Sequence, residues 1–71
     1  MNDPRWVKVY TVNNPMDAHM VQAVLEENEI GVLLLDKNDS SYGFGHVEIL
    51  VLEDKVPEAI SLIQSNFEKK N

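Results

Sequence analysis

The sequence predicts an α+β domain built as a two-layer sandwich, a three-stranded sheet with two helices packed on one face. Two observations lead to this fold class. Residues 46–53 contain four consecutive apolar residues, some of them β-branched, which is typical of a strand buried on both faces in the middle of a sheet. Two further stretches carry apolar residues at helical spacing, so the predicted elements include two amphipathic helices.

The first predicted strand covers residues 6–12, where β-forming residues alternate. Strict alternation places Trp6, Tyr10 and Val12 on one face of this strand. The first helix is predicted from Pro15 to about residue 28. Asn14 before it can cap free backbone amides, and proline at the first helical position has no N–H to leave unpaired.

The second strand is predicted at residues 30–35, which are apolar throughout. Asn28 is expected to end the preceding helix because asparagine tolerates the left-handed conformation common there. Turn-forming residues fill the next ten positions, 36–45, and predict the one long loop. In the third strand, 46–53, parity places Leu50 and Leu52 on the face opposite the helices.

The second helix is predicted to extend to Phe67, with Glu53 and Asp54 as its cap and Pro57 in its first turn. The element order is therefore strand, helix, strand, strand, helix. This order matches a ferredoxin-like βαββα unit that lacks its final strand, with residues 46–53 central and residues 6–12 as an open edge. We expect one domain, residues 1–71.

The composition limits the function classes. Twelve acidic and six basic residues give a net charge of −6, which repels nucleic acids and anionic membranes. The chain has no cysteine and no long apolar run, so we expect a cytoplasmic protein without disulfides. His19 and His46 have no metal-ligand spacing, and no residues form a recognisable catalytic or cofactor-binding motif, so we expect no enzyme and no cofactor.

The chain also resembles a family of short bacterial proteins described as putative signal-transducing proteins, which are related in fold to the nitrogen-signalling PII proteins. The matching residues lie along nearly the whole chain: Val9-Tyr10-Thr11, Pro15, Ala18, Val24-Leu25-Glu26, Ile30, Ile49-Leu50-Val51, Asp54, Ala59 and Phe67. Such sequences often have a glycine at the position of Glu29. The resemblance implies a ferredoxin-like fold and a regulatory role, and it supplies no catalytic or ligand-binding residues.

The sheet face opposite the helices is the first candidate site. Its predicted residues are Trp6, Tyr10, Val12, Leu50 and Leu52. An apolar patch of this kind on a monomer usually marks an interface, so we expect self-association, as a homodimer, or binding of a protein partner. The homodimer would form through this face or through the open edge strand, residues 6–12. The loop aromatics Tyr42 and Phe44 are a second candidate, either as a recognition loop or as a lid over the core.

The alternative hypothesis is a domain that senses a small molecule. Its ligand would lie between subunits or under the predicted loop, residues 36–45. A ligand that binds only the native state raises the melting temperature, so a thermal shift would favour this hypothesis. The sequence does not identify the partner, the ligand or the signal.

Overall fold

The structure, a computed structural model, describes residues 5–39 and 44–68. Its elements follow the predicted order. They are β1 (Trp6–Val12), α1 (Pro15–Glu27), β2 (Val32–Asp39), β3 (Phe44–Leu52), the 3₁₀ turn η1 (Glu53–Lys55) and α2 (Val56–Phe67).

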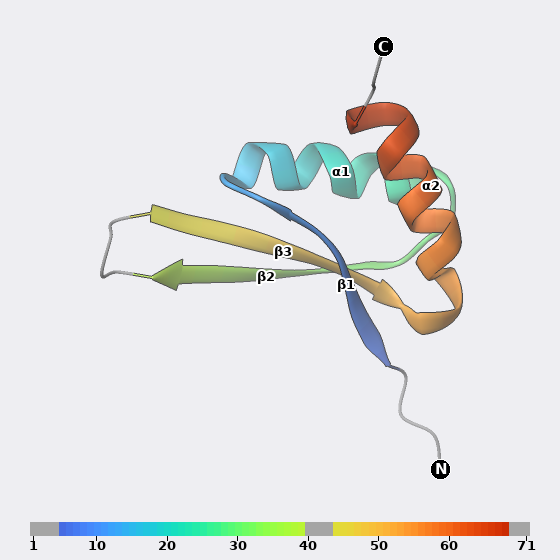
Figure 1. Ribbon diagram of the computed structural model, residues 1–71, viewed down its shortest axis with the longest axis horizontal. Coiled ribbons are helices and arrows are strands. Elements are labelled where there is room, and N and C mark those ends of the chain that lie inside the picture. The colour runs from blue at the N-terminus through green and yellow to red at the C-terminus, as the bar shows by residue number, and fades with distance from the viewer. Residues whose placement is uncertain (1–4, 40–43, 69–71) are drawn as a thin grey trace.

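The sheet has the strand order β1-β3-β2, and β3 pairs antiparallel with both neighbours. Both helices lie on one side of it (Figure 1). This is the ferredoxin-like layout without a fourth strand, and it confirms the predicted fold class and the central position of β3. The strand that would complete the layout would pair with β1, so β1 is an edge of the sheet.

The β2–β3 hairpin is longer than predicted, and the prediction of a loop at residues 36–45 is wrong. Continuous pairing runs from Val32↔Val51 to Asp39↔Phe44, so most of the predicted loop is strand. The polar residues there are turn formers by propensity, but pairing to the central strand overrides that preference. Figure 1 shows the hairpin extending past the start of α1.

Helix α1 begins as predicted. The Asn14 side chain accepts a hydrogen bond from the backbone N–H of Asp17 at 2.9 Å, and Pro15 occupies the first turn. The Asn14 amide also donates to the Asp17 carboxylate at 3.1 Å. These contacts satisfy helix-start donors and place a negative charge near the positive end of the helix dipole.

Helix α1 ends at Glu27, and the left-handed residue after it is Glu29 rather than the predicted Asn28. Asn28 has φ −101°, and Glu29 takes the left-handed conformation with φ 65°. The Ile30 N–H donates to the Leu25 carbonyl and the Glu29 N–H to the Glu26 carbonyl, both at 3.0 Å. This is a Schellman motif, and it turns the buried Ile30 back onto the core.

We expect Glu29→Gly to stabilise the protein by about 0.5 to 1 kcal/mol, because glycine adopts the left-handed conformation without steric strain. The thermal midpoint should rise by about 2 to 8 °C in circular dichroism melts. As a control, Ala23→Gly changes an exposed residue in the interior of α1 and should lower stability by about 1 kcal/mol. Equal losses in both variants would contradict the left-handed strain at Glu29.

Helix α2 begins differently from the prediction. Residues Glu53–Lys55 form a 3₁₀ turn, Lys55 is the residue before the helix, and no side chain caps it. Pro57 lies in the first turn, as predicted. The Glu53 N–H donates to the Arg5 carbonyl at 2.9 Å, which ties the turn after β3 to the start of β1.

The core lies between the sheet and the helices. Its fully buried side chains come from α1, from Ile30 just before β2, from β3 and, to a smaller extent, from α2. They are Val21, Leu25, Ile30, Ile49, Val51, Ala59 and Ile63. On α2, Ile60 is at helical spacing from Val56 and Ile63 in the sequence, yet it is 38% exposed. Leu62 packs against the core instead.

Candidate interaction surface

The sheet has one side that faces the helices and one side that no described element covers, and β3 has residues on both. Val47, Ile49 and Val51 are buried in the core with the helices. The alternating residues therefore point to the other side, which no element of the described part of the chain covers. We call this side the open face. Leu50 and Leu52 lie on it, as predicted.

A bulge in β1 moves two predicted residues off the open face. Lys8 pairs with Leu50 and Tyr10 with Ile49, so Val9 is an extra residue in the ladder. Because one extra residue reverses the side-chain alternation, Tyr10 and Val12 lie beside Ile49 and Val47 on the helix-facing side.

The prediction that Tyr10 and Val12 lie on the same face as Trp6 is therefore wrong. Val12 is buried in the core, and Tyr10 packs against it. Trp6 stays on the open face, opposite Leu52 and 40% exposed. Thr11 follows the bulge and lies there too, opposite Glu48.

Strand β2 contributes residues that the sequence analysis did not single out. Leu33 pairs with Leu50 and Leu35 pairs with Glu48, so both side chains belong to the open face. Leu33 is 36% exposed. A strand that is apolar at every position gives no signal of which side is uncovered, and the pairing with β3 supplies that information.

The open face thus has an apolar half. Its residues come from all three strands: Trp6, Leu33, Leu35, Leu50 and Leu52. Leu50 lies in the middle of the row Leu33–Leu50–Lys8 and is only 9% exposed although no helix covers it. The surface available to a partner is therefore largest at Trp6 and Leu33, one at each edge.

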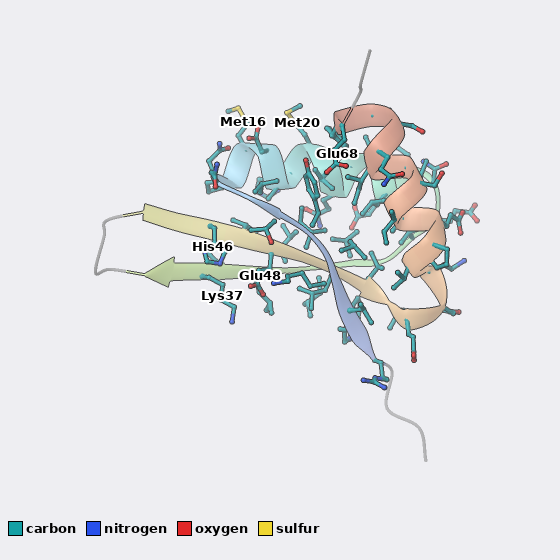
Figure 2. All side chains as sticks on the ribbon, viewed as in Figure 1. Met16, Met20, Lys37, His46, Glu48 and Glu68 are labelled. Atoms are coloured by element: carbon teal, nitrogen blue, oxygen red, sulfur yellow. The ribbon has the colours of Figure 1, made fainter. Side chains whose placement is uncertain are left out.

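The other half of the open face is charged. One Glu48 carboxylate oxygen lies 3.6 Å from Lys8 Nζ and 3.8 Å from His46 Nε2. Lys37 is the cross-strand neighbour of His46. Figure 2 labels Lys37, His46 and Glu48 near one another on the β2–β3 hairpin. Pairs this exposed contribute about 0 to 1 kcal/mol each, so they affect partner choice more than stability.

The other sequence candidates have mixed outcomes. Tyr42 lies outside the described residues, as does the Phe44 side chain, although the Phe44 backbone pairs with Asp39 in the hairpin. His19 lies on α1, away from the open face. Among the described residues, no group of three or more histidine and carboxylate side chains could hold a metal ion. No described helix is long and apolar enough to span a membrane.

Two of the pockets on the helix-facing side are lined by described residues and are open to solvent. One, of about 200 Å³, lies where β1, α1 and the end of α2 meet and is lined by Tyr10, Val12, Asp17, Met20, Val21 and Phe67. The other, of about 140 Å³, is lined by Pro15, Ala18, His19, Leu34, Asp36 and Val47. Both are smaller than the roughly 300 Å³ at which typical small-molecule sites begin.

The comparison with known families gives one match. The family described as "putative prokaryotic signal transducing protein" matches residues 6–66, which include every strand residue described above and both helices except for Phe67. No curated protein and no solved structure matches the chain significantly.

Proposed function

Because the chain belongs to the family of putative prokaryotic signal transducing proteins, we propose that it is a non-enzymatic regulatory module that acts by forming a homodimer across the open face. The observation that supports this proposal is the apolar half of that face, which no described element covers. Trp6 and Leu33 expose 40% and 36% of their surfaces there, and a second copy would remove that surface from water.

The size of the open face indicates a weak dimer. Three strands spaced about 4.8 Å apart, taken over the seven residues of the shortest strand, β1, cover roughly 350 Å² in projection. Stable interfaces bury about 800 Å² on each partner, and smaller ones are typical of transient complexes. The charged half of the face limits the apolar contact further. Monomer and dimer should therefore exchange with concentration, which suits a module that responds to a signal.

The combined substitution Trp6→Ala and Leu33→Ser tests this proposal. We expect the wild-type sedimentation coefficient to rise between about 10 µM and about 500 µM protein, and the variant to stay monomeric over that range. Both side chains are on the surface, so the circular dichroism spectrum should keep its helical signal.

Ile60→Ser is the matched control. Ile60 is 38% exposed on α2, close to the 36% of Leu33, but it lies in the helix layer. This control should associate like the wild type. A variant that dimerises as well as the wild type, or a control that loses dimerisation equally, would contradict the open face as the interface.

A small-molecule sensor is the second candidate function. The pocket beside His19 and Asp36 supports it, because Asp36 begins the segment under which the sequence analysis expected a ligand. Its volume of about 140 Å³ admits a molecule little larger than one ring. A thermal shift with a metabolite panel that is lost in His19→Ala, which changes an exposed residue lining this pocket, would favour the sensor over the dimer.

A further inference from the structure

The charged half of the open face contains one of the two histidines of the chain. His46 Nε2 lies 3.8 Å from a carboxylate oxygen of Glu48, and Lys8 Nζ lies 3.6 Å from the same oxygen. The imidazole is well exposed, with 41% of the His46 side chain accessible to water. Histidine is the side chain whose charge ordinarily changes roughly between pH 5 and 8. The charge of the open face therefore responds to modest changes of pH.

The charges at the open-face positions of the three strands balance when His46 is neutral. Lys8 and Glu48 lie there, and Lys37 on β2 is directly opposite His46. Position 39, an aspartate, is the next open-face position of β2 beyond Lys37. These positions carry two positive and two negative charges, and both helices lie on the other side of the sheet (Figure 1). Protonation of His46 leaves each copy with one uncompensated positive charge on this face.

A second copy on the open face cannot cover the apolar residues without covering these charges. Leu35 is the cross-strand partner of Glu48. Leu50 is the cross-strand partner of Lys8, so apolar and charged residues share the same rows of the sheet. His46 lies two residues beyond Glu48 on β3, which is about 7 Å along the strand. A copy that covers Leu35 and Glu48 therefore lies close to the His46 ring.

Two electrostatic effects act on such a dimer as the pH falls. The chain has a net charge of −6 at pH 7, so protonation of any histidine lowers the repulsion between two whole molecules and favours association. Protonation of His46 also has the opposite effect, because each copy then brings an uncompensated positive charge to the same interface. Salt at physiological concentration screens charges separated by more than about 8 Å. The charges inside the interface therefore outweigh the distant carboxylates.

We propose that protonation of His46 weakens the homodimer, so that pH regulates association through the open face. This inference rests on the proposed dimer across that face. The dimer forms with neutral His46, whereas in the monomer the charged imidazole is exposed to water beside Glu48. Because the dimer then binds fewer protons than two monomers, its dissociation constant rises as the pH falls through the titration of His46.

Sedimentation of the full chain over a concentration series, at about pH 8 and at about pH 5.5, tests the proposal. We expect the wild-type dissociation constant to be at least about threefold higher at the lower pH. His46→Gln stays neutral at both pH values, so its dissociation constant should be equal at both or slightly lower at the lower pH. His19→Gln is the matched control. His19 is the other histidine and is exposed on α1, so this variant should keep the wild-type response.

Lys37→Gln tests the charge balance itself. It removes one positive charge from an exposed position of the open face, so protonation of His46 then restores the balance instead of upsetting it. The proposal predicts that this variant dimerises more tightly at the lower pH, which is the reverse of the wild-type response. A general effect of acidity on folding would not change sign with this substitution. Circular dichroism at both pH values checks that each variant is folded.

The outcomes separate this proposal from the dimer on which it rests. A wild-type dissociation constant that is the same at both pH values would overturn the role of His46 and leave the open-face dimer intact. The same holds if the wild-type response persists in His46→Gln or disappears in His19→Gln. A wild type that stays monomeric at both pH values up to about 500 µM would contradict the open-face dimer, and this proposal with it.

Discussion

A Val12→Asn variant is expected to lose most of its free energy of unfolding, whereas Thr11→Asn keeps the native fold at close to its full stability. Val12 is buried in the core, and the asparagine loses apolar burial and leaves an amide without partners there, a cost of about 3 kcal/mol. A domain of this size has a net stability of only roughly 3 to 5 kcal/mol. Thr11 is exposed on the open face, so its replacement should cost less than about 1 kcal/mol.

This pair of substitutions tests the bulge at Val9 directly. Without the bulge, strict alternation would put Thr11 toward the helices and Val12 on the open face. Urea unfolding followed by circular dichroism gives the free energy of unfolding of each variant. If Thr11→Asn lowered the free energy of unfolding more than Val12→Asn, the pairing register between β1 and β3 would be wrong. The assignment of residues to the open face would then be wrong as well.

Leu25→Ala is expected to remove about 3 kcal/mol of stability, enough to populate the unfolded state in the absence of denaturant. Leu25 is fully buried, and its carbonyl accepts the hydrogen bond from Ile30 that closes the turn after α1. Alanine keeps that backbone bond but leaves a cavity where the side chain joined the helix to the sheet.

The control for Leu25→Ala is Met16→Ala, on the same helix. Met16 is 73% exposed, so its truncation should change the unfolding free energy by less than about 0.5 kcal/mol. Chemical unfolding curves measure both values. A loss below about 1 kcal/mol for Leu25→Ala would mean that α1 is not packed on the sheet through this residue.

Much of the fold follows from local features of the sequence. The run of four apolar residues predicts β3 as a strand, and its central place is confirmed. The edge strand β2 has a run of the same length, residues 32–35, so this pattern predicts a strand and the element order predicts its place. The Asn14-Pro15 start of α1 is a local hydrogen-bonding and steric feature, and the structure has it as predicted. These features could be predicted because they depend on residues a few positions apart.

The features that were missed depend on partners distant in sequence. Residues Lys8, Val9 and Tyr10 alternate regularly, and nothing in them signals the bulge that pairing with β3 imposes. Residues 36–39 are turn formers that become strand because residues 44–47 lie opposite them. For the candidate site, Leu50, Leu52 and Trp6 were placed on the correct face, and Tyr10 and Val12 were not.

The open face and the helix layer form two separate surfaces on opposite sides of the molecule. The open face is apolar with a mixed-charge end, while Met16 and Met20 are exposed on the helix layer. The sheet joins the two surfaces, because successive residues of one strand face opposite sides. For example, Val12 pairs with Val47 on the helix-facing side, and the next residue of β3, Glu48, lies on the open face.

The measurement that tests the central claim most directly is a dilution series followed by amide NMR spectra. If the homodimer forms across the open face, the amide shifts that move between about 500 µM and about 10 µM protein should cluster on that face. We expect the largest changes at Trp6, Leu33, Leu35, Leu50 and Leu52. Shifts confined to α1 and α2, or spectra unchanged over the whole series, would contradict the proposed dimer.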